Sequence, residues 1–120
     1  MTNGEFKAML EKRTVNFSLN TLKMLSGIHS SAESRCIKDQ LIRSATSVGA
    51  NYREANRAES RADFLHKIAI VVKEAAESEY WLILLQALHP EITSIGPISQ
   101  EAGELLRLFD SIHRSAQSRS

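Results

Sequence analysis

The stretch that decides the fold runs from Gln40 to Leu85 and reads QLIRSATSVGANYREANRAESRADFLHKIAIVVKEAAESEYWLILL. It contains two helix-length segments, with Ser60 between them as the predicted N-cap of the second; Asp63 three residues on completes an acidic variant of the capping box. Core positions of the first segment, which begins just before this stretch, step by 4 and 3: Ile37, Leu41, Ala45, Val48, Tyr52 and Ala55. The second segment repeats these steps: Phe64, Ile68, Val71, Ala75, Ser78, Leu82 and Leu85. Two sustained heptad seams of this kind predict two core helices of a bundle.

Amphipathic segments flank this stretch on both sides. The first keeps its apolar residues on one helical face: Phe6, Leu10, Phe17, Met24 and Ile28. The last repeats the heptad steps: Ile98, Ala102, Leu105, Phe109, Ile112 and Ala116. We therefore expect helices at about 5–28, 33–58, 60–88 and 98–117. Four such helices with short links predict an all-α, antiparallel up-down-up-down four-helix bundle that occupies 1–120 as a single domain.

Composition narrows the class of protein. A chain of 120 residues with a 42% hydrophobic fraction is large enough for one folded domain. The single cysteine, Cys36, cannot form an internal disulfide and favours a reducing, cytoplasmic setting. The apolar runs IAIVV and YWLILL are too short to span a bilayer, so no membrane association is expected. A net charge of +1 gives no electrostatic reason to expect nucleic acid, although it does not exclude it.

Polar residues recur at helical spacing on faces away from the two seams. We call nine of them the polar stripe: Arg43, Ser47, Asn51, Glu54, Lys73, Glu74, Glu77, Tyr80 and Trp81. In one interpretation they form a hydrogen-bonded layer that fixes register within the bundle or between subunits. In the other they bind a ligand or nucleic acid, with these basic residues as phosphate contacts: Arg43, Arg53, Arg57, Arg61 and Lys73. The first is favoured, because residues 35–67 hold seven basic and four acidic side chains, an excess of only three.

Two further features of the central stretch indicate close packing and self-association. Small residues, among them Ser44 and Gly49, lie between the seam and the stripe and suggest that another backbone approaches closely. The second segment carries apolar residues beyond its seam: Leu65, Ile70, Val72, Trp81, Ile83 and Leu84. A helix that is apolar on more than one side is normally buried on more than one side, so this surplus points to contact with another subunit.

No motif in the sequence demands an enzyme, and we expect no catalytic residue, cofactor or metal site. The pairs Asp63/His66 and Asp110/His113 have the i, i+3 spacing of di-iron bundles. They use the shorter aspartate and lie off the seams, so they do not point squarely inward. A small metal- or ligand-binding bundle that uses these pairs, or the carboxylates of Glu54 and Glu77, is kept as the alternative. The sequence has no G-x-S-x-G turn and no glycine-rich phosphate loop.

The same residues resemble the four-helix-bundle family named for the 23S rRNA intervening-sequence protein. Its R-x-x-x-S-x-x-x-N-x-x-E-[GA] run is matched by Arg43, Ser47, Asn51, Glu54 and Ala55. Its DF pair is Asp63-Phe64, and its KEA-x-E-x-x-YWL run is matched by Lys73, Glu74, Ala75, Glu77, Tyr80, Trp81 and Leu82. Ala55 stands where many members have glycine.

The resemblance covers nearly the whole chain and is sharpest between Gln40 and Leu85. It implies a cytoplasmic bacterial bundle that assembles with itself as a ring-like homopentamer, without a settled biochemical activity. Relatives encoded in ribosomal RNA insertions, and one accessory protein of retroelements that binds nucleic acid, make RNA a candidate partner. The function expected is a non-enzymatic, homo-oligomeric scaffold or binding module.

Overall fold

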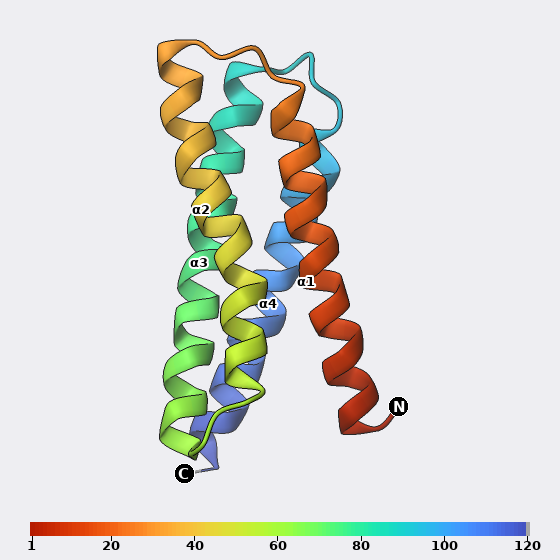
Figure 1. Cartoon of the computed structure of the whole chain (residues 1–120), viewed down its shortest axis with the longest axis vertical. Helices are drawn as coiled ribbons and strands as arrows, with labels where there is room; N and C mark the ends of the chain where they lie inside the picture. The colour runs from red at the N-terminus through yellow and green to blue at the C-terminus, as the bar shows by residue number, and fades with distance from the viewer. Residues whose placement is uncertain (120) are drawn as a thin grey trace.

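Four long α-helices make up the computed structural model, which describes residues 1–119. They are α1 (Asn3–Ser26), α2 (Ala32–Ala55), α3 (Arg61–Leu88) and α4 (Ile95–Ser118). The helices run alternately up and down along a molecule with extents of 46 × 25 × 19 Å (Figure 1). The described residues contain no strand. The predicted all-α, up-down-up-down four-helix bundle is confirmed.

The helix ends differ from the predicted ones by up to three residues, and local capping explains where they fall. Thr2 and Glu5 form a capping box, so α1 spans 3–26 instead of 5–28. α2 begins one residue earlier than expected and ends at Ala55 instead of 58, because the N–H groups of Arg57 and Ala58 bond three residues back, to the carbonyls of Glu54 and Ala55 at 3.0 and 3.1 Å, and do not continue the α-helical ladder. Ser60 is the N-cap of α3, which starts at 61, and it accepts from the Asp63 N–H at 3.0 Å.

The last helix begins three residues before the expected position. Pro97 is its third residue, where a backbone N–H would have no partner within the helix, so proline costs nothing there. α4 therefore spans 95–118 instead of 98–117 and gains Ile95, which is fully buried, as an extra core residue.

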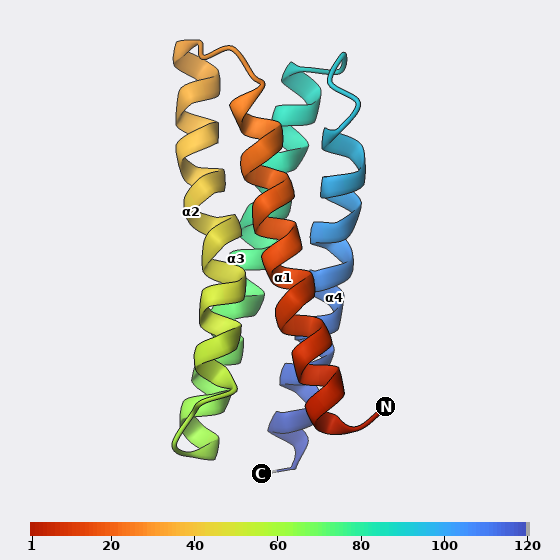
Figure 2. The same cartoon turned by 45° about the vertical axis from the view of Figure 1, so that its right-hand side comes forward.

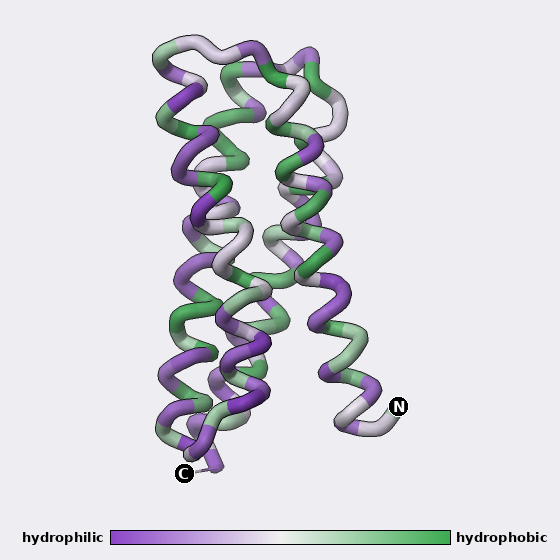
Figure 3. The backbone as a smooth tube through the Cα atoms, viewed as in Figure 1, coloured by the Kyte–Doolittle hydropathy of each residue, from purple (hydrophilic) through white to green (hydrophobic). Residues whose placement is uncertain are grey.

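The heptad positions form the core along most of the bundle. Leu41, Val48, Ile68, Leu82 and Leu105 are all fully buried. Burying one such aliphatic side chain stabilises the fold by about 1.5–3 kcal/mol. Along the tube in Figure 3, hydrophilic and hydrophobic residues alternate on every helix instead of forming separate blocks. Four heptad positions are only half-buried, and all lie at the same end of the bundle: Phe6, Phe64, Ile112 and Ala116.

The close approach predicted from small residues occurs between α2 and α1. A Cβ atom built on Gly49 would lie 2.8 Å from Thr14 Oγ1 and 3.1 Å from Thr14 Cβ. Nearby, the hydroxyl of Ser18 donates to the Ala45 carbonyl across the same interface at 3.0 Å. A larger residue than glycine would separate the two helices here, so Gly49 sets their spacing.

α1 packs closely on α2 but only loosely on α4. Figure 1 shows its N-terminal half diverging from the other helices, and Figure 2 shows the same helix from a second direction. The contact with α4 is made by an ion pair: Arg13 donates to Glu101 through Nε and Nη2 at 2.7 Å each, and to Glu104 at 3.0 Å. Two cavities lie along this loosely packed side of α1. Of the helices described, none is long and apolar enough to cross a membrane.

Candidate functional site

Four residues of the polar stripe meet between α2 and α3. Arg43 of α2 reaches across to α3, where its Nη1 donates to Glu74 Oε2 at 3.1 Å and its Nη2 to Glu77 Oε1. Trp81 Nε1 donates to the same Glu77 oxygen at 3.3 Å. Glu74, Glu77 and Trp81 follow one another at i, i+3 and i+7, which places them along one side of α3. We call these four residues the Arg43 cluster.

Hydrogen bonds between charged groups stabilise the Arg43 cluster. The hydrogen bond from Arg43 holds the pKa of Glu77 below its usual value; partial burial opposes this, and the Trp81 N–H reinforces it. The bond to Glu77 in turn raises the pKa of Arg43. Two carboxylates surround one guanidinium, so the cluster carries a formal charge of −1. Arg43 is therefore engaged by carboxylates and poorly placed to contact a phosphate, which favours the interpretation of the stripe as a layer that fixes register.

The rest of the stripe is not gathered into the same cluster. Ser47 donates to the Arg43 carbonyl at 2.6 Å, and Asn51 Nδ2 donates to the Ser47 carbonyl at 2.9 Å, so both bond back to their own helix. Glu54 forms a separate pair with Lys67 at 3.6 Å. The two remaining members, Lys73 and Tyr80, are exposed; the Tyr80 ring packs edge-on against Trp81 with centroids 5.2 Å apart.

A buried polar contact beneath the cluster was missed by sequence reasoning. Ser78 Oγ lies 2.9 Å from Ser44 Oγ and 2.9 Å from the Glu74 carbonyl oxygen, and both serines are fully buried. The only signal in the sequence was a serine at a heptad position of the third segment. It predicts burial, but it does not say which residue of the neighbouring helix is the partner.

Three of the other basic residues proposed as phosphate contacts, Arg53, Arg57 and Arg61, are also engaged. Arg53 Nε lies 3.5 Å from Glu11 Oε1, and Arg57 donates to the Arg53 carbonyl at 3.1 Å. Arg61 donates to the carbonyl of Ala116. These contacts spread the basic residues over separate local partners, so they do not form one continuous phosphate-binding row.

The residues proposed for a metal site are not brought together. Among residues 1–119, no three His, Cys, Asp or Glu side chains gather where they could share a metal ion. Asp110 pairs with Arg114 at 2.7 Å, one turn along its own helix. His66 is exposed on α3. The structure therefore gives the metal-binding alternative no support.

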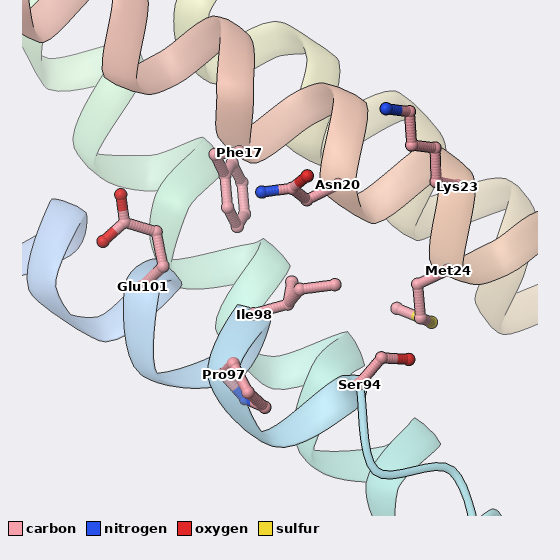
Figure 4. A pocket seen from close by; sticks show the side chains of 8 residues that line it. All are labelled: Phe17, Asn20, Lys23, Met24, Ser94, Pro97, Ile98 and Glu101. Carbon is pink, nitrogen blue, oxygen red and sulfur yellow. The ribbon is translucent and has the colours of Figure 1, made fainter.

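A cavity of about 480 Å³ lies between α1 and α4 (Figure 4). Phe17 of α1 and Ile98 of α4 point into it, and Met24 and Pro97 add apolar surface. Its one carboxylate, Glu101, is held by Arg13. The cavity is an apolar cleft without a catalytic pair among its lining residues.

The described residues thus define a small helical bundle whose distinctive chemistry is an ion-paired cluster between α2 and α3. The chain belongs to the 23S rRNA-intervening sequence protein family, whose model matches residues 7–91. This match covers most of α1 and all of α2 and α3. Comparison with curated proteins finds no match.

A solved structure agrees with this assignment. The chain is 35% identical to a protein of unknown function from the S23 ribosomal protein family of Bacteroides thetaiotaomicron VPI-5482. The alignment covers 86% of this chain and 96% of that one, with a TM-score of 0.76. Neither the family description nor that of the solved relative assigns an enzymatic activity.

Proposed function

We propose that this chain is a non-enzymatic, self-assembling scaffold or binding module of the bacterial cytoplasm. In this proposal it forms a ring-like homopentamer that associates with nucleic acid, in particular RNA. The observation that carries the proposal is a pair of exposed apolar stripes on two helices that lie diagonally across the bundle.

The first stripe lies on the outer face of α1. Val15, Leu19 and Leu22 are spaced by 4 and 3 residues, so they share one helical face. Their exposed fractions are 41%, 46% and 37%. Lys12 and Lys23 are exposed on the same side. Three large aliphatic side chains in a row on an exposed face are typical of a surface that packs against another chain.

The second stripe lies on the outer face of α3. Tyr80 and Ile83 are each 54% exposed, and the half-buried Leu84 adjoins them. The Arg43 cluster borders this stripe through Trp81, so its position is fixed by hydrogen bonds. Of the six apolar residues that the sequence places beyond the seam, none is fully buried in the single chain: Ile83 is exposed, and the other five are half-buried.

The placement of the two stripes suits a ring. A closed ring uses a head-to-tail interface, which needs two different and complementary surfaces on each subunit. α1 and α3 lie diagonally opposite each other in the bundle and do not pack against each other, so their outer faces point in different directions. Charge also matches: α1 holds four basic and two acidic residues, and α3 holds three basic and four acidic residues. We therefore place the α1 stripe of one subunit against the α3 stripe of the next.

The nucleic-acid part of the proposal is supported by the family's name and by two arginines at the loop between α2 and α3. Arg57 lies in this loop and Arg61 is the first residue of α3; both are exposed, although both also make contacts within the chain. A single subunit with a net charge of +1 would bind phosphates weakly. A ring repeats the loop in every subunit, and several weak contacts on one strand raise the overall affinity by multivalency.

Light scattering at several concentrations tests the assembly. The 13.4 kDa chain is expected to give a particle of about 67 kDa, five times its own mass. Ile83→Glu and Leu19→Glu each place a charge in one stripe and should give monomers. Ala62→Glu, at an exposed position on α3 outside both stripes, is the matched control and should leave the mass unchanged. A monomer at every concentration would overturn the assembly.

A salt titration tests the nucleic-acid partner. Fluorescently labelled single-stranded RNA and DNA of equal length are titrated with the protein at low salt and again at higher salt. Phosphate-driven binding should weaken steeply as salt rises. Arg57→Ala should reduce affinity in the assembled protein more than in the Ile83→Glu monomer. Absence of RNA binding at low salt would remove this partner and leave the assembly untouched.

A further inference from the structure

The exposed aromatic side chain of the α3 stripe is held by its neighbour along the helix. Tyr80 is 54% exposed, and its ring packs edge-on against the half-buried indole of Trp81 with centroids 5.2 Å apart. Tyrosine and tryptophan side chains contribute much of the binding energy in protein interfaces. The orientation of the Trp81 indole therefore affects how Tyr80 is presented to a neighbouring subunit.

Trp81 is itself held by one carboxylate oxygen. Its Nε1 donates to Glu77 Oε1 at 3.3 Å, one helical turn back. The same oxygen accepts from Arg43 Nη2, so Glu77 connects the indole of α3 to the neighbouring helix α2. An indole has a single N–H donor, and this bond therefore favours one orientation of the ring.

Glu77 depends on Arg43 for its own position. The Glu77 side chain is 27% exposed, so without a partner its carboxylate would be free to turn toward water. The guanidinium is anchored through its second nitrogen: Nη1 donates at 3.1 Å to Glu74, whose side chain is only 9% exposed. A guanidinium is planar and rigid, so a bond at one nitrogen orients the other. The buried Glu74 thus fixes Arg43, and Arg43 fixes Glu77.

The helices beneath the cluster are held in register as well. Ser78 Oγ lies 2.9 Å from Ser44 Oγ, and both serines are fully buried. Ser44 follows Arg43 in α2, and Ser78 follows Glu77 in α3. Arg43 and Glu77 therefore face each other from fixed backbone positions, and their pairing needs no rearrangement when another chain binds.

We infer that Arg43 is the positioning residue of the α3 stripe, where Tyr80 and Trp81 meet a neighbouring subunit. Through Glu77 it orders the Trp81 indole, and through the indole it orders Tyr80, before the neighbour binds. The inference rests on the proposed assembly and names the residue that prepares one of its two surfaces. A side chain that is ordered in advance loses less conformational entropy on association, and two such side chains correspond to about tenfold in affinity.

Arg43→Ala in one chain of a mixed pair tests the inference. Leu19→Glu chains keep only the α3 stripe, and Ile83→Glu chains keep only the α1 stripe, so their mixture forms a single contact between α1 and α3. Measured by calorimetric titration, Arg43→Ala in the Leu19→Glu chain should weaken this contact about tenfold. The same replacement in the Ile83→Glu chain, whose α3 stripe is not used, is the matched control and should leave the affinity unchanged.

Two further variants separate positioning from loss of charge. Glu77→Ala in the Leu19→Glu chain leaves the pair of Arg43 with Glu74 intact and should also weaken the contact about tenfold, which provides a readout even if Arg43→Ala fails to fold. Arg43→Lys keeps the positive charge and should restore part of the affinity. Direct attraction between the cluster and basic residues of the neighbour predicts the opposite for Arg43→Ala, because the cluster would become more negative and the contact would tighten.

Time-resolved fluorescence anisotropy reports the order of the indole without a partner, because Trp81 is the one tryptophan of the chain. In the Leu19→Glu monomer, Arg43→Ala should increase the fast rotation of the indole. Lys67→Ala removes a different ion pair between α2 and α3, the one with Glu54, and should leave this rotation unchanged.

Four results would overturn the inference, and one of them also contradicts the assembly. Absence of any contact between the Leu19→Glu and Ile83→Glu chains would contradict the proposed assembly and, with it, the role of Arg43. Where the contact forms, an affinity that Arg43→Ala leaves unchanged or raises would contradict only that role. Equal weakening from either chain would show a general effect on the fold. Unchanged rotation of the Trp81 indole in the Arg43→Ala monomer would show that Arg43 does not order it.

Discussion

Replacement of Gly49 by alanine tests how tightly α1 and α2 are packed. The new Cβ would lie 2.8 Å from Thr14 Oγ1, a distance that Cβ atoms essentially never show in folded proteins, and 3.1 Å from Thr14 Cβ, which is tighter than most Cβ contacts. The hydroxyl of Thr14 is held by the Glu11 carbonyl at 2.6 Å, and no rotation of the side chain moves its Cβ. The helices must therefore separate by a few tenths of an ångström.

The magnitude follows from two opposing effects. Alanine is favoured over glycine inside a helix by about 1 kcal/mol. Overpacking of a fitted interface costs about 1–3 kcal/mol. Gly49→Ala should therefore lower the free energy of unfolding by about 1 kcal/mol, measured by urea unfolding and followed by far-ultraviolet circular dichroism.

Gly103→Ala is the matched control, because Gly103 is also a buried glycine in the middle of a helix. The Cβ built there meets Glu79 Oε2 at 2.9 Å and Arg107 Nη1 at 3.3 Å, the ends of flexible side chains that can move aside. This variant should be stabilised by about 0.5–1 kcal/mol. If Gly49→Ala is stabilised as much as the control, the close packing of α1 on α2 is refuted.

Three further predictions concern polar contacts between the helices. Arg43 lowers the pKa of Glu77, so this ion pair stabilises the fold at pH values above the ordinary carboxyl pKa of about 4.3. The stabilisation is lost as the pH falls through the lowered pKa. Glu77→Gln should therefore reduce the free energy of unfolding by about 1 kcal/mol at pH 7 and by progressively less in acid. Ser78→Ala should cost about 1 kcal/mol, and the double replacement with Ser44→Ala should cost less than the sum of the single ones. Arg13→Ala should speed amide hydrogen exchange in α1 more than in the other helices.

Each of these predictions has a clear contrary result. A stability difference for Glu77→Gln that is the same at pH 7 and pH 3 would show that the ion pair contributes nothing. Additive costs for the two serines would mean that they do not interact. Uniform exchange in all helices after Arg13→Ala would show that this residue does not hold α1 to the bundle.

The fold could be predicted because its signal is repeated along the chain. Heptad spacing in each of the four segments marks residues such as Leu41, Val48 and Leu82 as core, and the structure buries them fully. Capping by Ser60 was predicted as well, since the hydroxyl and the N–H that it accepts from are three residues apart. Short-range rules of this kind are contained in the sequence itself.

Contacts between helices could not be predicted in the same way. Arg43 and Glu77 were both placed on the polar stripe, but their pairing depends on how α2 and α3 are rotated against each other. Asn56, the C-cap of α2, bonds through its side chain to Glu11, a residue 45 positions away. The half-buried Phe6 and Phe64 follow the core pattern, and only the divergence of α1 leaves them open.

The exposed stripe on α1 is different, because its signal was present and was missed. Val15, Leu19 and Leu22 have heptad-like spacing of their own, and they lie on the face opposite the core residues Leu10, Phe17 and Met24. The core-facing pattern of α1 accounts for only one of the two apolar faces of this helix. A test for a second apolar face on α1, such as the one applied to the third segment, would have found it.

Mixing two interface variants tests the head-to-tail contact most directly. Leu19→Glu keeps an intact α3 stripe, and Ile83→Glu keeps an intact α1 stripe. Each variant alone should be a monomer, and an equimolar mixture should form a heterodimer of about 27 kDa, twice the 13.4 kDa chain mass, as measured by native mass spectrometry. Homodimers of either variant alone, or a mixture that stays monomeric, would contradict the contact between α1 and α3 of neighbouring subunits.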